Sequence, residues 1–320
     1  MPRLPADRLL RRLEWTSLRR LDGLLQGDYR TLMRGSGLDL ADLREYQYRD
    51  DVRRIDWNAT ARLDHPHVRD DLEDRELGAW FVLDLSPSVD FGSGLVTKRQ
   101  AAAALCGLLG LLLLRHGNRF GAIRAEGPRR EVLPARSGRA HLMQLIDWID
   151  HPAASPGAPR ARDEAPATGL TNLGDLLGAA GGVARRRSLV IVLSDFISTP
   201  GWQPALARLA LRHDVLAVRL LDPVERALPD LGLVPMRDAE TGDWMMVDTH
   251  DPDWRARHDA LAGEREEALL GDFAAAGVDA MELGTDEDPG EALAALLRLR
   301  RLQARLRAGA ASAVAAAGRG

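Results

Sequence analysis

The feature that most constrains this sequence is an alternation of short apolar runs with longer helical segments, which begins after Leu77. Residues 79–85 (AWFVLDL) and 188–193 (SLVIVL) are apolar runs of strand length. Strands that alternate with helices of ten or more residues predict a parallel sheet covered on both faces. The predicted fold class is therefore α/β, with a doubly wound, mostly parallel sheet. Further strands are expected at 119–124, 131–135, 215–221 and 278–283, and helices at 97–116, 140–149, 172–184, 203–212 and 289–306.

Three segments fall outside this alternation. Residues 1–76 are expected to form an N-terminal helix and a small β-rich module, and residues 308–320, rich in alanine and glycine, a disordered tail. In the α/β domain of residues 77–307, a turn between two alternating segments predicts a hairpin insertion at about 224–250. The leucines of residues 5–26 recur at helical spacing, so that helix either packs on its own domain or contacts a membrane or a partner.

The composition excludes several classes of function. The chain has 47 acidic and 43 basic residues, so the basic excess typical of nucleic-acid-binding proteins is absent. Its longest run of apolar residues and glycine, residues 101–114, is shorter than the about 20 residues of a membrane-spanning helix. One cysteine, Cys106, excludes an intramolecular disulfide framework. We therefore predict a soluble cytoplasmic protein without a transmembrane segment. Lys98 is the only lysine, and we interpret the preference for arginine as a coding bias.

Polar side chains follow two of the predicted central strands. Asp84, Ser86 and Ser88 end the first strand, Asp195 follows the later one, and Thr171 begins a helix between them. In a doubly wound sheet, ligands bind outside the carboxyl ends of the strands, where the strand order reverses. If the two strands flank that point, all five residues reach one crevice. Hard oxygen donors suit Mg²⁺ or Mn²⁺, and a divalent ion offsets the repulsion between two carboxylates.

Each part of this pattern also has a purely structural explanation. Serine and proline after an aspartate are ordinary turn chemistry, and Thr171 alone can be a helix N-cap. The combination of all five residues with their strand positions favours a metal site.

The five residues resemble the metal-ion-dependent adhesion site of von Willebrand factor A-type domains, which combines D-x-S-x-S, a threonine and an aspartate. More closely, the chain resembles the bacterial family called domain of unknown function 58 over roughly residues 5–285. Several segments carry this resemblance in order: Gly35-Ser36-Gly37, Leu43-Arg44-Glu45-Tyr46, Asp50–Trp57, Ala61-Arg62, Val68-Arg69, Glu73–Glu76 and Arg237–Asp243. Arg49 stands where that family usually has glycine, and we expect this chain to lack the N-terminal transmembrane pair of many longer members.

The resemblance implies a von Willebrand A-like fold and a bound Mg²⁺ or Mn²⁺. Ser86, Ser88 and Thr171 would ligate the ion directly, and Asp84 and Asp195 mostly through water. The sixth position would accept a carboxylate from a client protein. The resemblance also implies a MoxR-type AAA+ ATPase as partner, with this chain as its non-enzymatic adaptor in the assembly or activation of other proteins.

A Mg/Mn-dependent hydrolase is the alternative, because the same ion can activate water. The sequence has no Walker A, G-x-S-x-G or H-E-x-x-H motif, and the aspartates are the only evident bases near the site. We therefore expect no enzymatic activity. A third alternative is a structural scaffold whose site stays empty.

Overall fold

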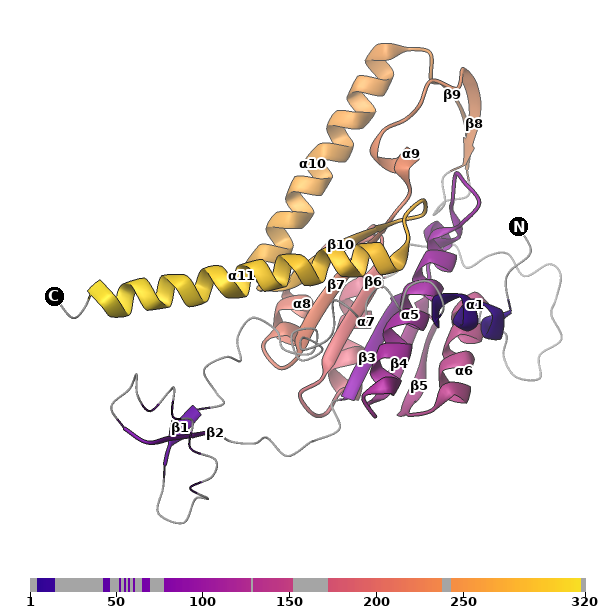
Figure 1. The fold of residues 1–320 in the computed structure, drawn as a ribbon. Helices are drawn as coiled ribbons and strands as arrows, with labels where there is room; N and C mark the ends of the chain where they lie inside the picture. The colour runs from indigo at the N-terminus through magenta and orange to yellow at the C-terminus, as the bar shows by residue number, and fades with distance from the viewer. Residues whose placement is uncertain are drawn as a thin grey trace.

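The structure is a computed structural model with a six-stranded sheet at its centre and helices on both faces of that sheet (Figure 1). It describes residues 5–14, 43–46, 65–69, 78–127, 129–151, 172–237 and 243–317, together with residues 52, 55, 57 and 60.

The central sheet is doubly wound and mostly parallel, as predicted. Its strands are β3 (Gly78–Asp84), β4 (Arg119–Glu126), β5 (Arg129–Arg136), β6 (Leu189–Ser194), β7 (Asp214–Leu221) and β10 (Asp279–Gly284). Their order across the sheet is β5-β4-β3-β6-β7-β10, and only β5 is antiparallel to its neighbour. The chain starts at β3, winds outward to β5 and returns to β6. The strand order therefore reverses between β3 and β6, which is the topological switch point.

The two strands at the switch point are apolar along their length because both of their faces are covered. Successive side chains of a strand point to opposite faces. On β3, Phe81 packs into one core and Val82 into the other, and Ile191 and Val192 of β6 divide in the same way.

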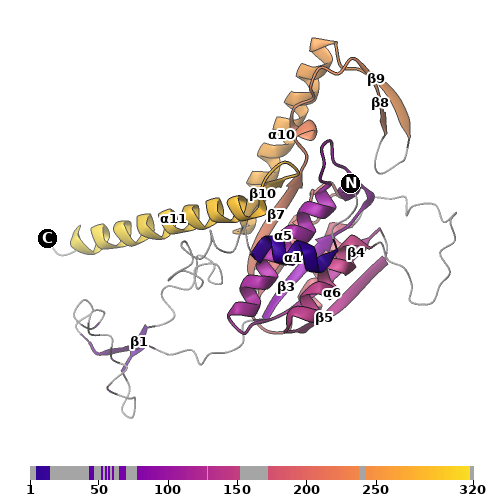
Figure 2. The ribbon, with the colours of Figure 1, turned by 45° about the vertical axis from the view of Figure 1, so that its right-hand side comes forward.

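Each face of the sheet is covered by its own layer of helices. The first layer contains α1 (Ala6–Leu13), α5 (Lys98–Arg115), α6 (Arg139–Asp150) and the first turns of α11 (Pro289–Ala317). The second contains α7 (Leu173–Val183), α8 (Gln203–Ala210) and the last turns of α10 (Pro252–Ala276). Figure 2 shows α1 lying across α5 and α6. Leu10 and Leu13 of α1 are buried there, so this part of the leucine-rich N-terminal segment packs on the α/β core.

Two long helices differ from the expectations. Helix α10 was not predicted, because its polar and apolar residues form no clear stripe and Phe273 is its only fully buried side chain. The side chain of Asp251 caps its first turn. Helix α11 continues to Ala317, whereas a disordered tail was predicted from residue 308. Alanine is the strongest helix former, which favours continuation of the helix through this segment.

Two short antiparallel pairs lie outside the central sheet. Strands β1 (Leu43–Glu45) and β2 (His67–Arg69) pair in the N-terminal region. Strands β8 (Leu233–Arg237) and β9 (Trp244–Asp248) form the predicted hairpin, which follows the short helix α9 (Pro223–Arg226). Among the described helices, none is both long and apolar enough to cross a membrane.

Candidate metal centre

The switch point brings most of the predicted site residues to one edge of the sheet. Asp84 is the last residue of β3, Ser86 is the N-cap residue of the 3₁₀ helix η3 (Pro87–Asp90), and Ser88 lies within that helix. Asp195 directly follows β6, which is hydrogen-bonded to β3 in parallel. Thr171 lies outside the described residues.

Hydrogen bonds hold the first three side chains together. Asp84 Oδ1 accepts a hydrogen bond from the Ser86 backbone N–H at 3.2 Å. Ser86 Oγ and Ser88 Oγ lie 3.0 Å apart. On the other side, Asp84 Oδ2 accepts from Ser194 Oγ at 2.7 Å, which connects the end of β3 to the end of β6. All four residues are buried, so the turn presents its oxygens in a fixed arrangement.

The donor set fits a small divalent cation. Adjacent oxygen ligands of an octahedral Mg²⁺ at about 2.1 Å are about 3 Å apart, which matches the separation of the two serine oxygens. Among the described residues, no group of three His, Cys, Asp or Glu side chains could hold a metal. A metal here would therefore depend on the hydroxyl ligands as well as on the carboxylates.

The pKa of Asp84 indicates that a positive charge beside its carboxylate would be favourable. Burial, followed by the negative charge of Asp195, raises its pKa to about 6, although the hydrogen bonds from Ser194 and Ser86 act in the opposite direction. Two carboxylates in one buried site repel each other, and a cation between them removes that repulsion.

The residue after Asp195 has an unusual backbone. Phe196 has a φ of 58°, in the left-handed region that bulky side chains rarely adopt. Its ring packs on Phe273 and Trp202, with centroids 4.9 Å and 5.4 Å away, and its N–H donates to Ser194 Oγ at 2.8 Å. These contacts hold a backbone turn that costs on the order of 1–3 kcal/mol, immediately beside the predicted ligand.

A buried cation that was not predicted from the sequence lies at this edge. Lys98 is fully buried, and its Nζ lies 3.1 Å from Asp195 Oδ2 and 2.7 Å from Glu225 Oε1. Burial acts to lower the pKa of Lys98, but the two carboxylates outweigh it and raise that pKa above its ordinary value. A signal was present in the sequence, because this is the single lysine in a chain whose other 42 basic residues are arginine.

Asp222, which directly follows β7, connects three loops at the same edge. Its carboxylate accepts from Ser93 N and Oγ, from Thr285 Oγ1 and from Val224 N, at 2.6–3.1 Å. Burial acts to raise the pKa of Asp222, but these hydrogen bonds lower it below its ordinary value. Since all of its lone pairs are engaged within the protein, Asp222 is a structural carboxylate.

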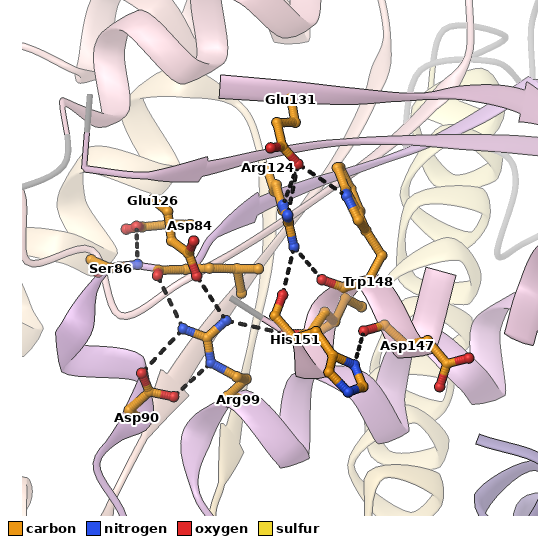
Figure 3. A network of polar contacts seen from close by, with 12 residues as sticks. Asp84, Ser86, Asp90, Arg99, Arg124, Glu126, Glu131, Asp147, Trp148 and His151 are labelled. Atoms are coloured by element: carbon orange, nitrogen blue, oxygen red, sulfur yellow. Dashed lines mark hydrogen bonds and ion pairs between the residues drawn. The ribbon is translucent and has the colours of Figure 1, made fainter. Parts of the chain in front are cut away.

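A second buried cation, Arg99, supports the serine turn (Figure 3). Its guanidinium donates to both carboxylate oxygens of Asp90, at 2.6 Å and 3.2 Å, and to the Leu85 carbonyl at 3.2 Å. It also donates to the Ile149 carbonyl of α6 at 3.1 Å. Because Leu85 lies between Asp84 and Ser86, Arg99 fixes the backbone that carries these two side chains.

Arg124 of β4 makes a similar connection farther along the sheet (Figure 3). It pairs with Glu131 at 2.6 Å and donates to the His151 carbonyl at 2.9 Å. Its guanidinium also stacks 4.4 Å from the ring centre of Trp148. Arg124 therefore satisfies carbonyls at the C-terminal end of α6, where a cation is favourable.

Exposed apolar side chains follow both site loops. Phe91 and Leu95 come after the serine turn, and Ile197 comes two residues after Asp195; these side chains are 41%, 71% and 45% exposed. The β8–β9 hairpin adds exposed side chains of the same kind: Leu233, Trp244, Met245 and Met246. Phe91, Leu95 and Ile197 thus place exposed apolar side chains on the two segments that carry the predicted ligands.

The fold and the site define an α/β protein with an oxygen-donor cluster at the switch point of a doubly wound sheet. The chain belongs to the family described as "Protein of unknown function DUF58", which matches residues 42–268. It is 41% identical over 241 residues to the uncharacterized protein Rv1480 of Mycobacterium tuberculosis, which covers 75% of this chain and 72% of that protein. An uncharacterized protein of Mycobacterium avium, MAV169, is 40% identical over 113 residues, or 34% of this chain and 59% of that protein.

Two of the solved structures that are similar to this chain have low sequence identity to it. One is an aerotolerance-related membrane protein from Bacteroides fragilis, with 14% identity, a TM-score of 0.42 and coverage of 70% of this chain and 98% of that chain. The other is the SpRpn10 VWA domain, with 11% identity, a TM-score of 0.38 and coverage of 69% and 93%. The identification of the family rests on the sequence matches.

Proposed function

We propose that this protein is a non-enzymatic adaptor that uses a divalent metal ion to bind an acidic side chain of a client protein. Ser86, Ser88 and Thr171 would hold Mg²⁺ or Mn²⁺ directly, and Asp84 and Asp195 through water. When bound, the ion supplies a Lewis-acidic position for a carboxylate of the client. The observation that carries the proposal is the meeting of buried hydroxyl and carboxylate oxygens at the switch point.

The residues of this chain have distinct parts in that binding. Ser194 orients Asp84 through its 2.7 Å hydrogen bond, and Arg99 holds the backbone of the turn through the Leu85 carbonyl. The neutral serine ligands leave positive charge on the ion, which favours an incoming carboxylate. The exposed Phe91, Leu95 and Ile197 would add apolar contacts around that carboxylate.

We extend the proposal to the partner that the family resemblance implies, a MoxR-type AAA+ ATPase in the cytoplasm. The adaptor would present the client to the ATPase, which would supply the nucleotide hydrolysis. The absence of a Walker A sequence in this chain supports that division of work.

A thermal melt tests the metal site. The full chain is melted in EDTA, in saturating Mg²⁺ and in saturating Mn²⁺, beside Ser86→Ala and Asp195→Ala. A ligand at about 100 times its Kd stabilises the native state by about 2.7 kcal/mol, which is a shift of several degrees for a chain of this size. We expect this shift in the unmodified chain and its loss in both variants.

Ser188→Ala is the matched control for this test. Ser188 is also buried and also borders β6, but it lies at the opposite end of that strand and donates to the Arg186 carbonyl. We expect it to keep the metal-dependent shift. A shift that Ser86→Ala retains would place the metal elsewhere and contradict the proposal.

A turnover assay separates the adaptor from the hydrolase. The chain is incubated with Mn²⁺ and generic phosphoester substrates, beside Asp84→Ala. We expect no turnover. If the unmodified chain turns over a substrate and Asp84→Ala abolishes that turnover, the adaptor proposal is wrong and the protein is a metal-dependent hydrolase.

A further inference from the structure

Lys98 occupies a position that two physical rules make unfavourable for a cation. It is the first residue of α5, where the helix dipole favours negative charge, and its side chain is completely buried. The start of the helix is held by a capping box between Thr97 and Gln100 and by a 2.9 Å hydrogen bond from Lys98 N to the Phe91 carbonyl. Since the backbone is fixed, the ammonium is directed at the site.

The ammonium is paired with a predicted ligand of the metal. Lys98 Nζ lies 3.1 Å from Asp195 Oδ2, and the other oxygen, Oδ1, accepts from Ile197 N at 3.1 Å. Both oxygens of Asp195 are thus engaged before any metal binds. A divalent ion near Asp195 would meet a like charge held on the same carboxylate.

Glu225 supplies a second carboxylate, so the Lys98 ammonium can move away from Asp195 and remain paired. Glu225 Oε1 lies 2.7 Å from Lys98 Nζ, closer than Asp195, and its side chain is 28% exposed. Its other oxygen accepts from Asp222 N at 3.0 Å, which anchors Glu225 at the start of α9. A buried ammonium that loses one partner therefore keeps another.

The charges of the group are consistent with a divalent ion that binds at Asp195 while the ammonium stays paired with Glu225. Asp84, Asp195 and Glu225 carry three negative charges when ionised, and Lys98 carries one positive charge. Two negative charges remain, which a divalent ion balances. Lysine suits this role, because its ammonium is a compact charge on a flexible stem, whereas the guanidinium used at every other basic position is broad and planar.

We propose that Lys98 is an internal competitor of the divalent metal for Asp195, so that metal occupies the site only when the ammonium is held by Glu225 alone. This inference rests on the proposed metal site and adds a residue that sets its affinity. The divalent metal would therefore bind weakly, and only while Lys98 is paired with Glu225 alone.

Mn²⁺ binding to the full chain tests the competition. Free Mn²⁺ is measured by electron paramagnetic resonance for the unmodified chain, Lys98→Met and Glu225→Gln. We expect Lys98→Met to bind Mn²⁺ at least about tenfold more tightly, since a like charge is removed. Glu225→Gln should bind more weakly, because Lys98 then depends on Asp195 alone. Arg187→Gln is the control, since Arg187 pairs with Asp214 at the opposite end of the strands and its loss should leave Mn²⁺ affinity unchanged.

The outcomes separate this inference from the proposed function. Tighter binding by Lys98→Met, or binding by that variant alone, supports the competition. Equal or weaker binding by Lys98→Met overturns the competition but leaves the metal site in place. No Mn²⁺ binding by any variant overturns both. If circular dichroism shows that Lys98→Met does not fold, Glu225→Gln decides: weaker binding supports the competition, and unchanged or tighter binding overturns it.

Discussion

Single buried charges determine how the candidate site responds to pH. Asp84 has a pKa of about 6 in the folded chain, because of burial and then the charge of Asp195, against 3.8 for an ordinary aspartate. The protonated carboxyl is thus favoured in the folded state. The stability that this group contributes is complete below pH 3.8 and is lost as the pH rises through 6.

We predict that, in EDTA, the free energy of unfolding falls by about 1 kcal/mol more in the unmodified chain than in Asp84→Asn between about pH 5 and pH 7. Urea unfolding at both pH values measures this difference. In saturating Mg²⁺ the fall should shrink, because the ion stabilises the ionised carboxylate. Identical pH dependence in the two chains in EDTA would show that Asp84 does not titrate in this range.

Close packing of helices positions the first turn of α5 at the site. Gly110 of α5 lies against Leu142 of α6: a Cβ at this position would overlap Leu142 Cδ1 and lie 3.3 Å from Cδ2. Leu142 is fully buried, so it has little room to move. The absence of a side chain at Gly110 lets the two helices approach and form the layer from which Lys98 and Arg99 extend.

We predict that Gly110→Ala lowers the free energy of unfolding by about 1–3 kcal/mol, although alanine is the better helix former. Gly178→Ala on α7 is the matched control, because a Cβ there meets nothing within 4 Å. That substitution should raise the free energy of unfolding, by up to about 1 kcal/mol. Urea unfolding of the two variants gives the comparison. Stabilisation by both substitutions would contradict the close contact.

At the scale of the whole molecule, Asp222 joins parts of the chain that are distant in sequence. Its carboxylate ties the loop after β3, through Ser93, to the loop after β10, through Thr285. Because these hydrogen bonds lower its pKa, its contribution to stability is present above pH 3.8 and is lost as the pH falls further, opposite in sign to Asp84.

We predict that Asp222→Asn lowers the free energy of unfolding by about 2 kcal/mol, because an amide NH₂ replaces one carboxylate oxygen and faces two donors. Urea unfolding at neutral pH measures this loss in the free energy of unfolding. Asp248→Asn is the control, since Asp248 is exposed on β9 and accepts only the local N–H of His250 among the hydrogen bonds described. If Asp248→Asn lowers the free energy of unfolding as much as Asp222→Asn does, the hydrogen bonds of Asp222 to the three loops contribute no particular stability.

The site could be predicted in part from sequence. Asp84, Ser86, Ser88 and Asp195 follow apolar runs, and parallel strands bring their carboxyl ends to one edge. Lys98 and Glu225 could not be placed by the same reasoning, because Lys98 contacts Asp195 and Glu225 across 97 and 127 residues of sequence. Helix α10 was missed for a local reason: it is mostly exposed and therefore lacks an apolar stripe.

The sequence by itself determined the class of fold, the hairpin and the D-x-S-x-S turn. These features depend on local periodicity and turn chemistry, which a short window of residues contains. Only the tertiary structure decided that Asp84 and Asp195 meet beside a buried lysine, because those contacts arise from the pairing of β3 with β6 and from the docking of α5 and α9 against the same edge. Such contacts depend on chain topology, which the sequence of any one segment does not contain.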